Sequence, residues 1–165
     1  MPMQSDAFIV DAGETRTGGP LFLLGETISI KITGRDTGGK YTIFETTTPV
    51  NGGPPLHMHH REDEWFYVLE GEFLFQVGDQ RIRAATGAAL FAPHDVPHTF
   101  LNVGTTPGRT LVVAEPAGIE MFFTEMAAAC VNDPPDPAAI MPVLEKYGLE
   151  LLGPPLAAQS KPACA

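Results

Sequence analysis

Charged residues are scarce in this chain, and basic residues are the scarcest of them. Only 18% of the 165 residues are charged, and 10 Lys and Arg stand against 20 Asp and Glu, which gives a net charge of −10 with neutral histidines. An acidic surface repels phosphate backbones and anionic lipid. We therefore expect neither nucleic acid nor a membrane as a partner.

Cysteine is almost absent, and so are targeting and membrane signals. Cys130 and Cys164 are too few for a disulfide framework and favour a reducing compartment. Residues 1–11 contain no basic stretch followed by an apolar core, as a secretory signal would. No apolar run approaches the roughly 20 residues that cross a bilayer. These absences predict a soluble, cytoplasmic protein.

Glycine and proline, in contrast, are abundant. The 17 glycines and 16 prolines make up one residue in five, which argues against a helical bundle or coiled coil. They are dispersed between apolar runs, and 44% of the chain is hydrophobic, which argues against disorder. We expect one domain with many tight turns, an all-β sandwich or barrel.

The β-type pattern extends over residues 21–116. Ile28, Ile30 and Ile32 alternate with polar residues, which is the period of a half-buried strand. Similar short runs follow, separated by turn signals. Among these signals, Glu70-Gly71 predicts a hairpin that joins the runs on either side of it.

After Pro116 the pattern becomes helical. Residues 119–130 contain no Gly or Pro and predict a helix. Asp136 and Pro137 are typical of an N-cap and a first helical turn, Gly148 is typical of a C-cap, and Pro142 either interrupts this second helix or restarts it. The predicted organisation is an N-terminal segment (1–20), a barrel (21–116), a helical segment packed on the barrel (117–153) and a loose tail (154–165).

The residues with the most chemical potential form a histidine-rich constellation. His57 and His59 are two residues apart, so on a strand their imidazoles share a face. Glu64 follows after a possible bend, and His98 lies on another β-type run. A histidine pair alone is weak evidence, because most histidines are ordinary surface or core residues. Three imidazoles and one carboxylate, however, suit a divalent first-row metal and leave coordination positions open.

The other two histidines are expected to lie outside this constellation. Strand parity points His60 away from His57 and His59, and His94 lies in a turn.

The two segments that contain these residues match the cupin motifs G(X)5HXH(X)3,4E(X)6G and G(X)5PXG(X)2H(X)3N. The matching positions are His57, His59, Glu64, Gly71, Gly87, Pro93, His98 and Asn102. Asn51 and Asp95 replace motif glycines, and these are the two residue types that best tolerate a left-handed backbone. The chain thus resembles the cupin superfamily, and most closely its quercetin 2,3-dioxygenase-like subgroup.

This resemblance implies an all-β double-stranded β-helix, a jelly-roll barrel, here followed by C-terminal helices. It implies one divalent transition metal ion (Fe, Mn, Ni, Cu, Co or Zn) as the cofactor. It also favours a homodimer, because cupins commonly associate through apolar sheet faces.

Strand parity predicts an apolar pocket around the metal. Side chains an even number of positions from Glu64 or His98 on the same strand are expected to point inward, as are those opposite them across the expected hairpin. Tyr41 is a further candidate. The predicted pocket residues are Tyr41, Phe66, Val68, Phe73, Phe75, Phe100 and Asn102. Such a lining suits a small, flat, hydrophobic substrate, although each phenylalanine is as readily explained as barrel filling.

The residues out of phase with Glu64 are apolar too. They are Trp65, Tyr67, Leu69 and, on the next run, Leu74. A solvated face is rarely so apolar. The N-terminal segment, the C-terminal helices or a second subunit is expected to cover it.

The resemblance favours an oxygenase of the quercetinase type, acting on a small, flat, hydroxylated aromatic or enol substrate. Glu64 would then be both a metal ligand and the base that takes the substrate proton. One alternative is another metal-dependent reaction (isomerase, epimerase or hydrolase), which needs a further acid or base, with Tyr41 and Glu45 as candidates. The other is a non-catalytic small-molecule-binding protein.

Overall fold

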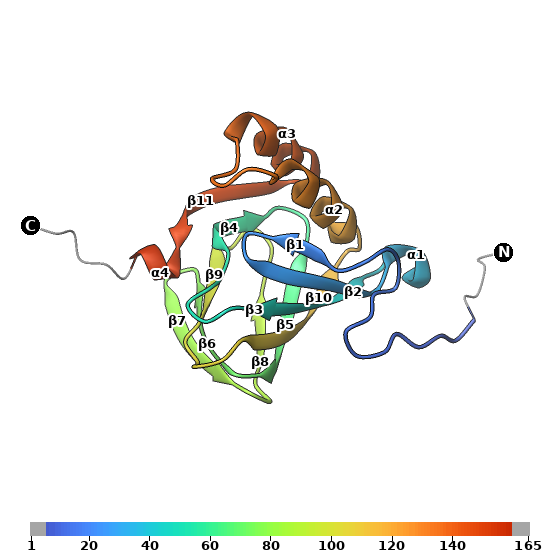
Figure 1. Cartoon of the computed structure of the whole chain (residues 1–165), viewed down its shortest axis with the longest axis horizontal. Coiled ribbons are helices and arrows are strands. Elements are labelled where there is room, and N and C mark those ends of the chain that lie inside the picture. Colours follow the sequence, from blue (N-terminus) through green and yellow to red (C-terminus); the bar gives the residue numbers. More distant parts are fainter. Residues whose placement is uncertain (1–5, 160–165) are drawn as a thin grey trace, which may run out of the picture.

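Two antiparallel sheets face each other in the computed structural model, which describes residues 6–159 (Figure 1). The six-stranded sheet contains, in spatial order, β1 (Leu21–Leu23), β2 (Glu26–Ile32), β3 (Thr42–Thr48), β10 (Gly108–Glu115), β5 (Asp63–Glu70) and β8 (Ala89–Ala92). The five-stranded sheet contains β11 (Leu149–Pro155), β4 (Pro55–His59), β9 (His98–Asn102), β6 (Glu72–Val77) and β7 (Gln80–Ala85). This arrangement confirms the predicted all-β jelly roll with C-terminal helices.

The predicted hairpin at Glu70-Gly71 is wrong. β5 pairs with β10 and β8, whereas β6 pairs with β7 and β9, so the chain passes from one sheet to the other at this turn. Alternation could not reveal this, because a hairpin and a corner between two packed sheets bury the same set of alternate residues. Phe66 and Phe75 still meet, but across the sandwich, with ring centroids 5.3 Å apart.

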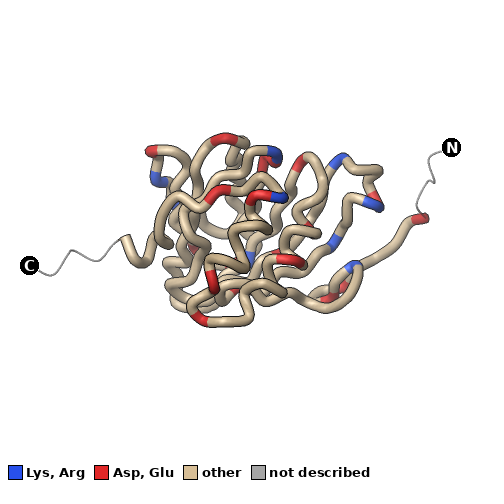
Figure 2. The backbone as a smooth tube through the Cα atoms, turned by 90° about the horizontal axis from the view of Figure 1, so that it is seen from above, with Lys and Arg blue, Asp and Glu red and all other residues tan. Residues whose placement is uncertain are grey.

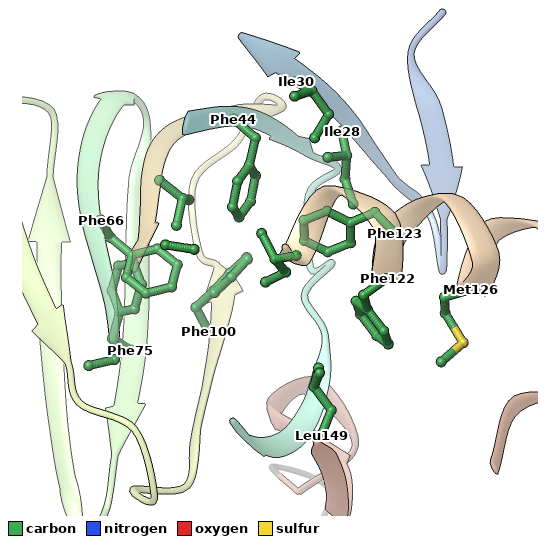
Figure 3. Close-up of a cluster of buried hydrophobic side chains, with 14 of the residues drawn as sticks. Ile28, Ile30, Phe44, Phe66, Phe75, Phe100, Phe122, Phe123, Met126 and Leu149 are labelled. Carbon is green, nitrogen blue, oxygen red and sulfur yellow. The ribbon is translucent and has the colours of Figure 1, made fainter. Parts of the chain in front are cut away.

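Aromatic side chains from both sheets fill the interior. Phe66 and Phe100 approach each other across the barrel, with ring centroids 6.0 Å apart. Figure 3 shows Phe44 close to Phe123 of helix α2 (Ile119–Ala129), and their ring centroids are 4.9 Å apart. The helix therefore completes the core that the two sheets begin.

The C-terminal helices begin and end close to where the sequence predicts. α2 covers the predicted residues less one, and α3 (Pro137–Tyr147) begins at the expected cap, where Asp136 Oδ1 accepts from the amide N of Ala138 at 2.9 Å. Gly148 ends α3 with φ +71°, a conformation that glycine adopts without strain. Pro142 lies inside α3 and neither interrupts nor restarts it. Two short helices, α1 (Gly34–Thr37) and α4 (Leu156–Gln159), complete the fold.

The segment after α3 was not expected to be a strand. β11 pairs with β4 and places Leu149 opposite His59 and Leu151 opposite His57. The expectation of a loose tail from residue 154 is wrong for residues 154–159, because β11 continues to Pro155 and Leu156 is 1% exposed in α4. Prolines are tolerated here because β11 is an edge strand. The rest of that tail, with Cys164, and residues 1–5 lie outside the described residues.

The outward apolar face stays open in the single chain. Trp65 and Tyr67 are 56% and 45% exposed, and Leu69 is half-buried. Leu74 is half-buried too, but it lies on β6 of the other sheet and does not belong to this face. Trp65 contacts Phe91 of β8, with ring centroids 5.3 Å apart, and Phe91 is also exposed. Neither the described part of the N-terminal segment nor the C-terminal helices cover this patch.

The excess of acidic over basic residues is visible in the structure. Acidic residues, drawn red in Figure 2, are spread from Asp6 to Glu150 and outnumber the basic ones. Within residues 6–159, no helix is both long and apolar enough to cross a membrane.

Candidate metal centre

The four predicted ligands come together between the two sheets. His57 and His59 lie on β4 and His98 lies opposite His57 on β9, whereas Glu64 comes from β5 of the facing sheet. One nitrogen from each imidazole and one carboxylate oxygen all lie within 4.8 Å of one another. We call these four residues the His/Glu cluster. Strand pairing thus brings His57 and His98 together, although they are 41 residues apart in the sequence.

Each imidazole of the cluster is oriented by an acceptor behind it. Nδ1 is within hydrogen-bonding distance of Pro55 O in His57 (2.7 Å), of Glu62 Oε2 in His59 (3.3 Å) and of Val96 O in His98 (3.2 Å). A carbonyl or carboxylate acceptor fixes the proton on Nδ1 and leaves the Nε2 lone pair for a metal. These acceptors therefore favour the tautomer with the proton on Nδ1, which is the one that metal binding through Nε2 requires.

The electrostatics of the cluster favour a charged carboxylate at Glu64 and a neutral imidazole at His57. Burial alone would raise the pKa of Glu64, but His59 and His98 outweigh it and lower the pKa to about 2. Glu64 Oε2 lies 2.8 Å from His98 Nε2 and 3.4 Å from His59 Nε2. Burial, with His98 and His59 nearby, lowers the pKa of His57 to about 3. These are the protonation states in which the groups ligate a divalent cation, so the residues fit such an ion.

His59 has a buried carboxylate on each side. Burial would lower its pKa, but Glu64 and Glu62 overcome that effect and raise it. Glu62 is 4% exposed, and sequence reasoning missed it. Its only signal is an acidic residue three positions after a predicted ligand.

A cavity of about 130 Å³ opens onto the cluster. His57, His59 and Glu64 form its polar part, and most of the remaining lining is apolar. Of the predicted pocket residues, Phe66 and Phe100 line this cavity.

The other predicted pocket residues do not line the cavity. Val68, Phe73 and Phe75 face inward as parity requires, but each is at most 1% exposed and packs deeper in the barrel. Parity determines which face of a sheet a side chain occupies, and it does not determine the depth along the barrel axis.

Asn102 and Tyr41 are likewise absent from the cavity wall. Asn102 Nδ2 donates to the carbonyl oxygens of Thr48 and Thr106, at 3.0 and 2.9 Å, so this residue ties two loops together. Tyr41 is half-buried just before β3, out of phase with the inward-facing Thr42 and Phe44. Glu45 has the same parity as Tyr41 and accepts from Arg109.

Among the cavity residues that the sequence did not predict, two groups bear most directly on the site. Phe122, Phe123 and Met126 of α2 cover the cavity from one side, and Figure 3 shows these side chains next to the barrel. The other is Glu26, the first residue of β2, which is 9% exposed. Its parity with Ile28 could have revealed it.

His60 and His94 lie on the surface and outside the cluster. His60 contacts Asp95 and Glu150, at 2.6 and 3.1 Å, and His94 contacts Asp63 at 2.7 Å. These acidic partners raise the pKa of both histidines.

Comparison with known families agrees with this geometry. Residues 44–114, which contain all four cluster residues, match the family model of the cupin domain. This segment is therefore similar to a cupin domain. The match to this model does not extend to the helices that cover the cavity.

A curated relative and several solved structures are similar to this chain. An uncharacterised protein of Methanocaldococcus jannaschii is 29% identical over 79 residues, which are 48% of this chain and 63% of that protein. The structure of KdgF from Halomonas sp. has a TM-score of 0.60 at 17% identity and covers 71% of this chain and 99% of its own. An RmlC-like cupin from Shewanella frigidimarina has a TM-score of 0.58 at 19% identity, over 72% and 99%. At these identities the structural likeness shows the fold alone.

Proposed function

We propose that this protein is a metal-dependent enzyme whose His/Glu cluster binds one divalent transition metal ion and whose cavity binds a small hydroxylated aromatic or enol substrate. We propose oxygenase chemistry as its reaction. The observation that carries the proposal is the convergence of three correctly oriented imidazoles and one carboxylate at an apolar cavity. Imidazole and carboxylate accept several first-row metals, and we leave the choice among Fe, Mn, Ni, Cu, Co and Zn open.

The chain's own residues supply the remaining functions of the site. A bound metal ion would act as a Lewis acid and lower the pKa of a coordinated substrate hydroxyl. Glu64 Oε2 belongs to the cluster and is placed to receive that proton. The apolar lining, including Phe66 and Phe100, excludes water from the reacting atoms.

The size of the cavity limits the substrate. An engineered cavity of about 150 Å³ holds one benzene molecule, and this cavity measures about 130 Å³. A substrate of about one ring fits, whereas a three-ring flavonol requires that α2 and α3 move aside. We therefore propose a smaller substrate than the quercetinase resemblance alone implies.

A second candidate is a metal-dependent proton-transfer reaction such as isomerisation. That class needs an acid or base in addition to Glu64, and Glu26 lines the same cavity. A non-catalytic binding protein is the third possibility. The homodimer and the cytoplasmic location stay predictions.

Metal content and oxygen uptake test the proposal. Protein purified without added metal, and protein reconstituted with each candidate metal, should hold one ion per chain by elemental analysis. With small catechols or enols, the loaded protein should consume dioxygen. Turnover without oxygen uptake would favour the second candidate, and substrate binding without turnover would favour the third.

One variant completes this test. Glu64→Gln should keep the fold and lose turnover, and full activity in it would exclude Glu64 as the base. No stoichiometric metal in the wild-type protein, even after reconstitution, would refute the proposal.

A further inference from the structure

The cavity contains a carboxyl group that the proposed function does not use. Glu26 opens β2 and lines the same cavity as Glu64, although β3 and β10 separate their strands within the sheet. The Glu26 side chain is 9% exposed. Carboxyl groups are rarely buried without a partner or a function.

The hydrogen bonds of Glu26 leave one of its oxygens available. Thr48 Oγ1 donates to Oε1 at 2.6 Å, which fixes the orientation of the carboxyl group. Among residues 6–159, no hydrogen-bond partner contacts Oε2. The chain therefore holds one edge of the carboxyl group and presents the other to a ligand.

The surroundings of Glu26 favour its protonated form. Burial raises its pKa to about 7; the hydrogen bond from Thr48 opposes this effect and the charge of Glu64 adds to it. Cavity neighbours such as Ile28 and Phe44 offer no compensating charge. A protonated carboxyl group can donate a hydrogen bond or a proton, which Glu64 in its ionised form cannot.

We propose that Glu26 is a second catalytic residue of the cavity, which donates a proton to one oxygen of a small substrate while another oxygen of that substrate lies at the His/Glu cluster. This inference rests on the proposed substrate binding at the cluster and on the proton-transfer reaction named above as the second candidate. It narrows the substrate to a molecule of about one ring with two oxygen functions.

The proton transfer is balanced without any other reactant. Glu64 takes the proton of the substrate hydroxyl at the cluster, and the electron pair of that O–H bond shifts into the substrate. The Glu26 Oε2–H bond breaks, its electrons stay on Oε2, and a new O–H bond forms on the distant substrate oxygen. The substrate becomes its tautomer with unchanged charge and no change of oxidation state, and water returns the two carboxyl groups to their initial states.

Binding of simple phenols tests the contact. Catechol, resorcinol and hydroquinone carry two oxygens at three spacings, and phenol carries one. Calorimetric titration of the metal-loaded protein, without oxygen, should show at least one diphenol binding about tenfold more tightly than phenol, since one hydrogen bond contributes about that factor. In Glu26→Leu this preference should vanish. Glu26→Gln, which keeps the shape and a donor, should retain part of it.

Glu45→Gln is the matched control. Glu45 lies on the same sheet but outside the cavity lining, next to Arg109, so the preference should survive this substitution. An equal preference in Glu26→Leu and the wild type, or none in the wild type, would overturn the inference. If the wild type binds no metal, the proposed function fails, and the same titrations on the metal-free protein decide about Glu26 separately.

An infrared spectrum tests the role as a donor. The wild-type protein at pH 6 should show a carboxylic acid C=O band that disappears in Glu26→Gln and persists in Glu45→Gln. This band should shift when the preferred diphenol binds. If no such band depends on Glu26, the residue is not the proton donor.

Discussion

Two polar regions of one cavity carry a buried carboxyl group each, and their surroundings drive them in opposite directions. Glu64 has a pKa lowered to about 2, and Glu26 has a pKa raised to about 7. Burial disfavours the charged form in both. The difference comes from the neighbours, because His59 and His98 stabilise a carboxylate whereas Thr48 offers Glu26 only a hydroxyl. Two carboxyl groups with separated pKa values are the arrangement that acid–base catalysis requires.

Removing an imidazole from the Glu64 region should have the largest effect. His98→Ala deletes a ligand and the nitrogen that lies 2.8 Å from Glu64 Oε2. We expect metal affinity to fall by at least about 100-fold, measured by competition with a chelator, since loss of outer partners alone costs 10- to 100-fold. The rise in melting temperature that metal confers on the wild type should disappear as well.

His94→Ala is the control for this substitution. His94 is an exposed histidine that contacts Asp63, outside the cluster. Its loss should leave metal binding unchanged. Stoichiometric metal of undiminished affinity in His98→Ala would remove His98 from the ligand set.

The Glu26 region should be visible in how stability depends on pH. Because its pKa is about 7 in the folded state against 4.5 when unfolded, folded protein binds more protons between these values. The Glu26 contribution to the free energy of unfolding should therefore fall as pH rises from 4.5 to 7, by up to about 3 kcal/mol. His57, whose pKa is lowered to about 3, contributes a slope of the opposite sign below pH 6.5, so the Glu26 contribution is the difference between the wild type and a variant without this carboxyl group. Urea unfolding of the metal-free protein at several pH values measures this slope.

Glu26→Gln should remove the Glu26 contribution from that slope, because the amide does not titrate. Glu45→Gln should keep it, since Glu45 lies outside the cavity lining and beside Arg109. An unchanged slope in Glu26→Gln would mean that Glu26 is ionised in the folded protein, and the contrast between the two regions would collapse.

Removing the charge of Glu62 behind His59 should have a smaller effect on metal affinity. Glu62→Gln keeps the size of the side chain but removes the charge that lies 3.3 Å from His59 Nδ1. We expect metal affinity to fall 10- to 100-fold, measured by the same chelator competition. Glu145→Gln, on the exposed face of α3, should change nothing. Equal affinities in both variants would show that His59 needs no carboxylate behind it.

The role of the Glu64 region could be predicted from the sequence, whereas for Glu26 the sequence indicates an inward direction but not a role. The spacing of His57, His59 and Glu64 reports a local strand and bend, so chemistry and position are read together. Glu26 is recognisable only as an acid in phase with Ile28. Its role depends on which helix covers the barrel, and that is a long-range contact no local pattern encodes.

The same limit explains the other discrepancies in the fold. Alternation along β5 and β6 was read correctly, but it could not tell a hairpin from a corner between sheets. The prolines near residue 154 suggested a tail, whereas pairing of β11 with β4 decided the outcome. The inward and outward directions predicted for the side chains of β5 and β6 agree with the structure, whereas the predicted pairing of these two strands is wrong.

Substitutions on the outer face of β5 should affect the cavity least. They therefore test whether the contrast between Glu64 and Glu26 arises inside the cavity. Trp65 follows Glu64 in sequence but points outward with Tyr67. Trp65→Ser with Tyr67→Ser should change metal affinity and the pH slope little, and the stability of the single chain by at most about 0.5 kcal/mol. If the predicted homodimer forms through this patch, sedimentation velocity should show weaker association in the double variant. A wild type that stays monomeric at every concentration would contradict the homodimer. A large change, in the double variant, of the slope of unfolding free energy against pH would mean that the pKa of Glu26 depends on more than the cavity around it.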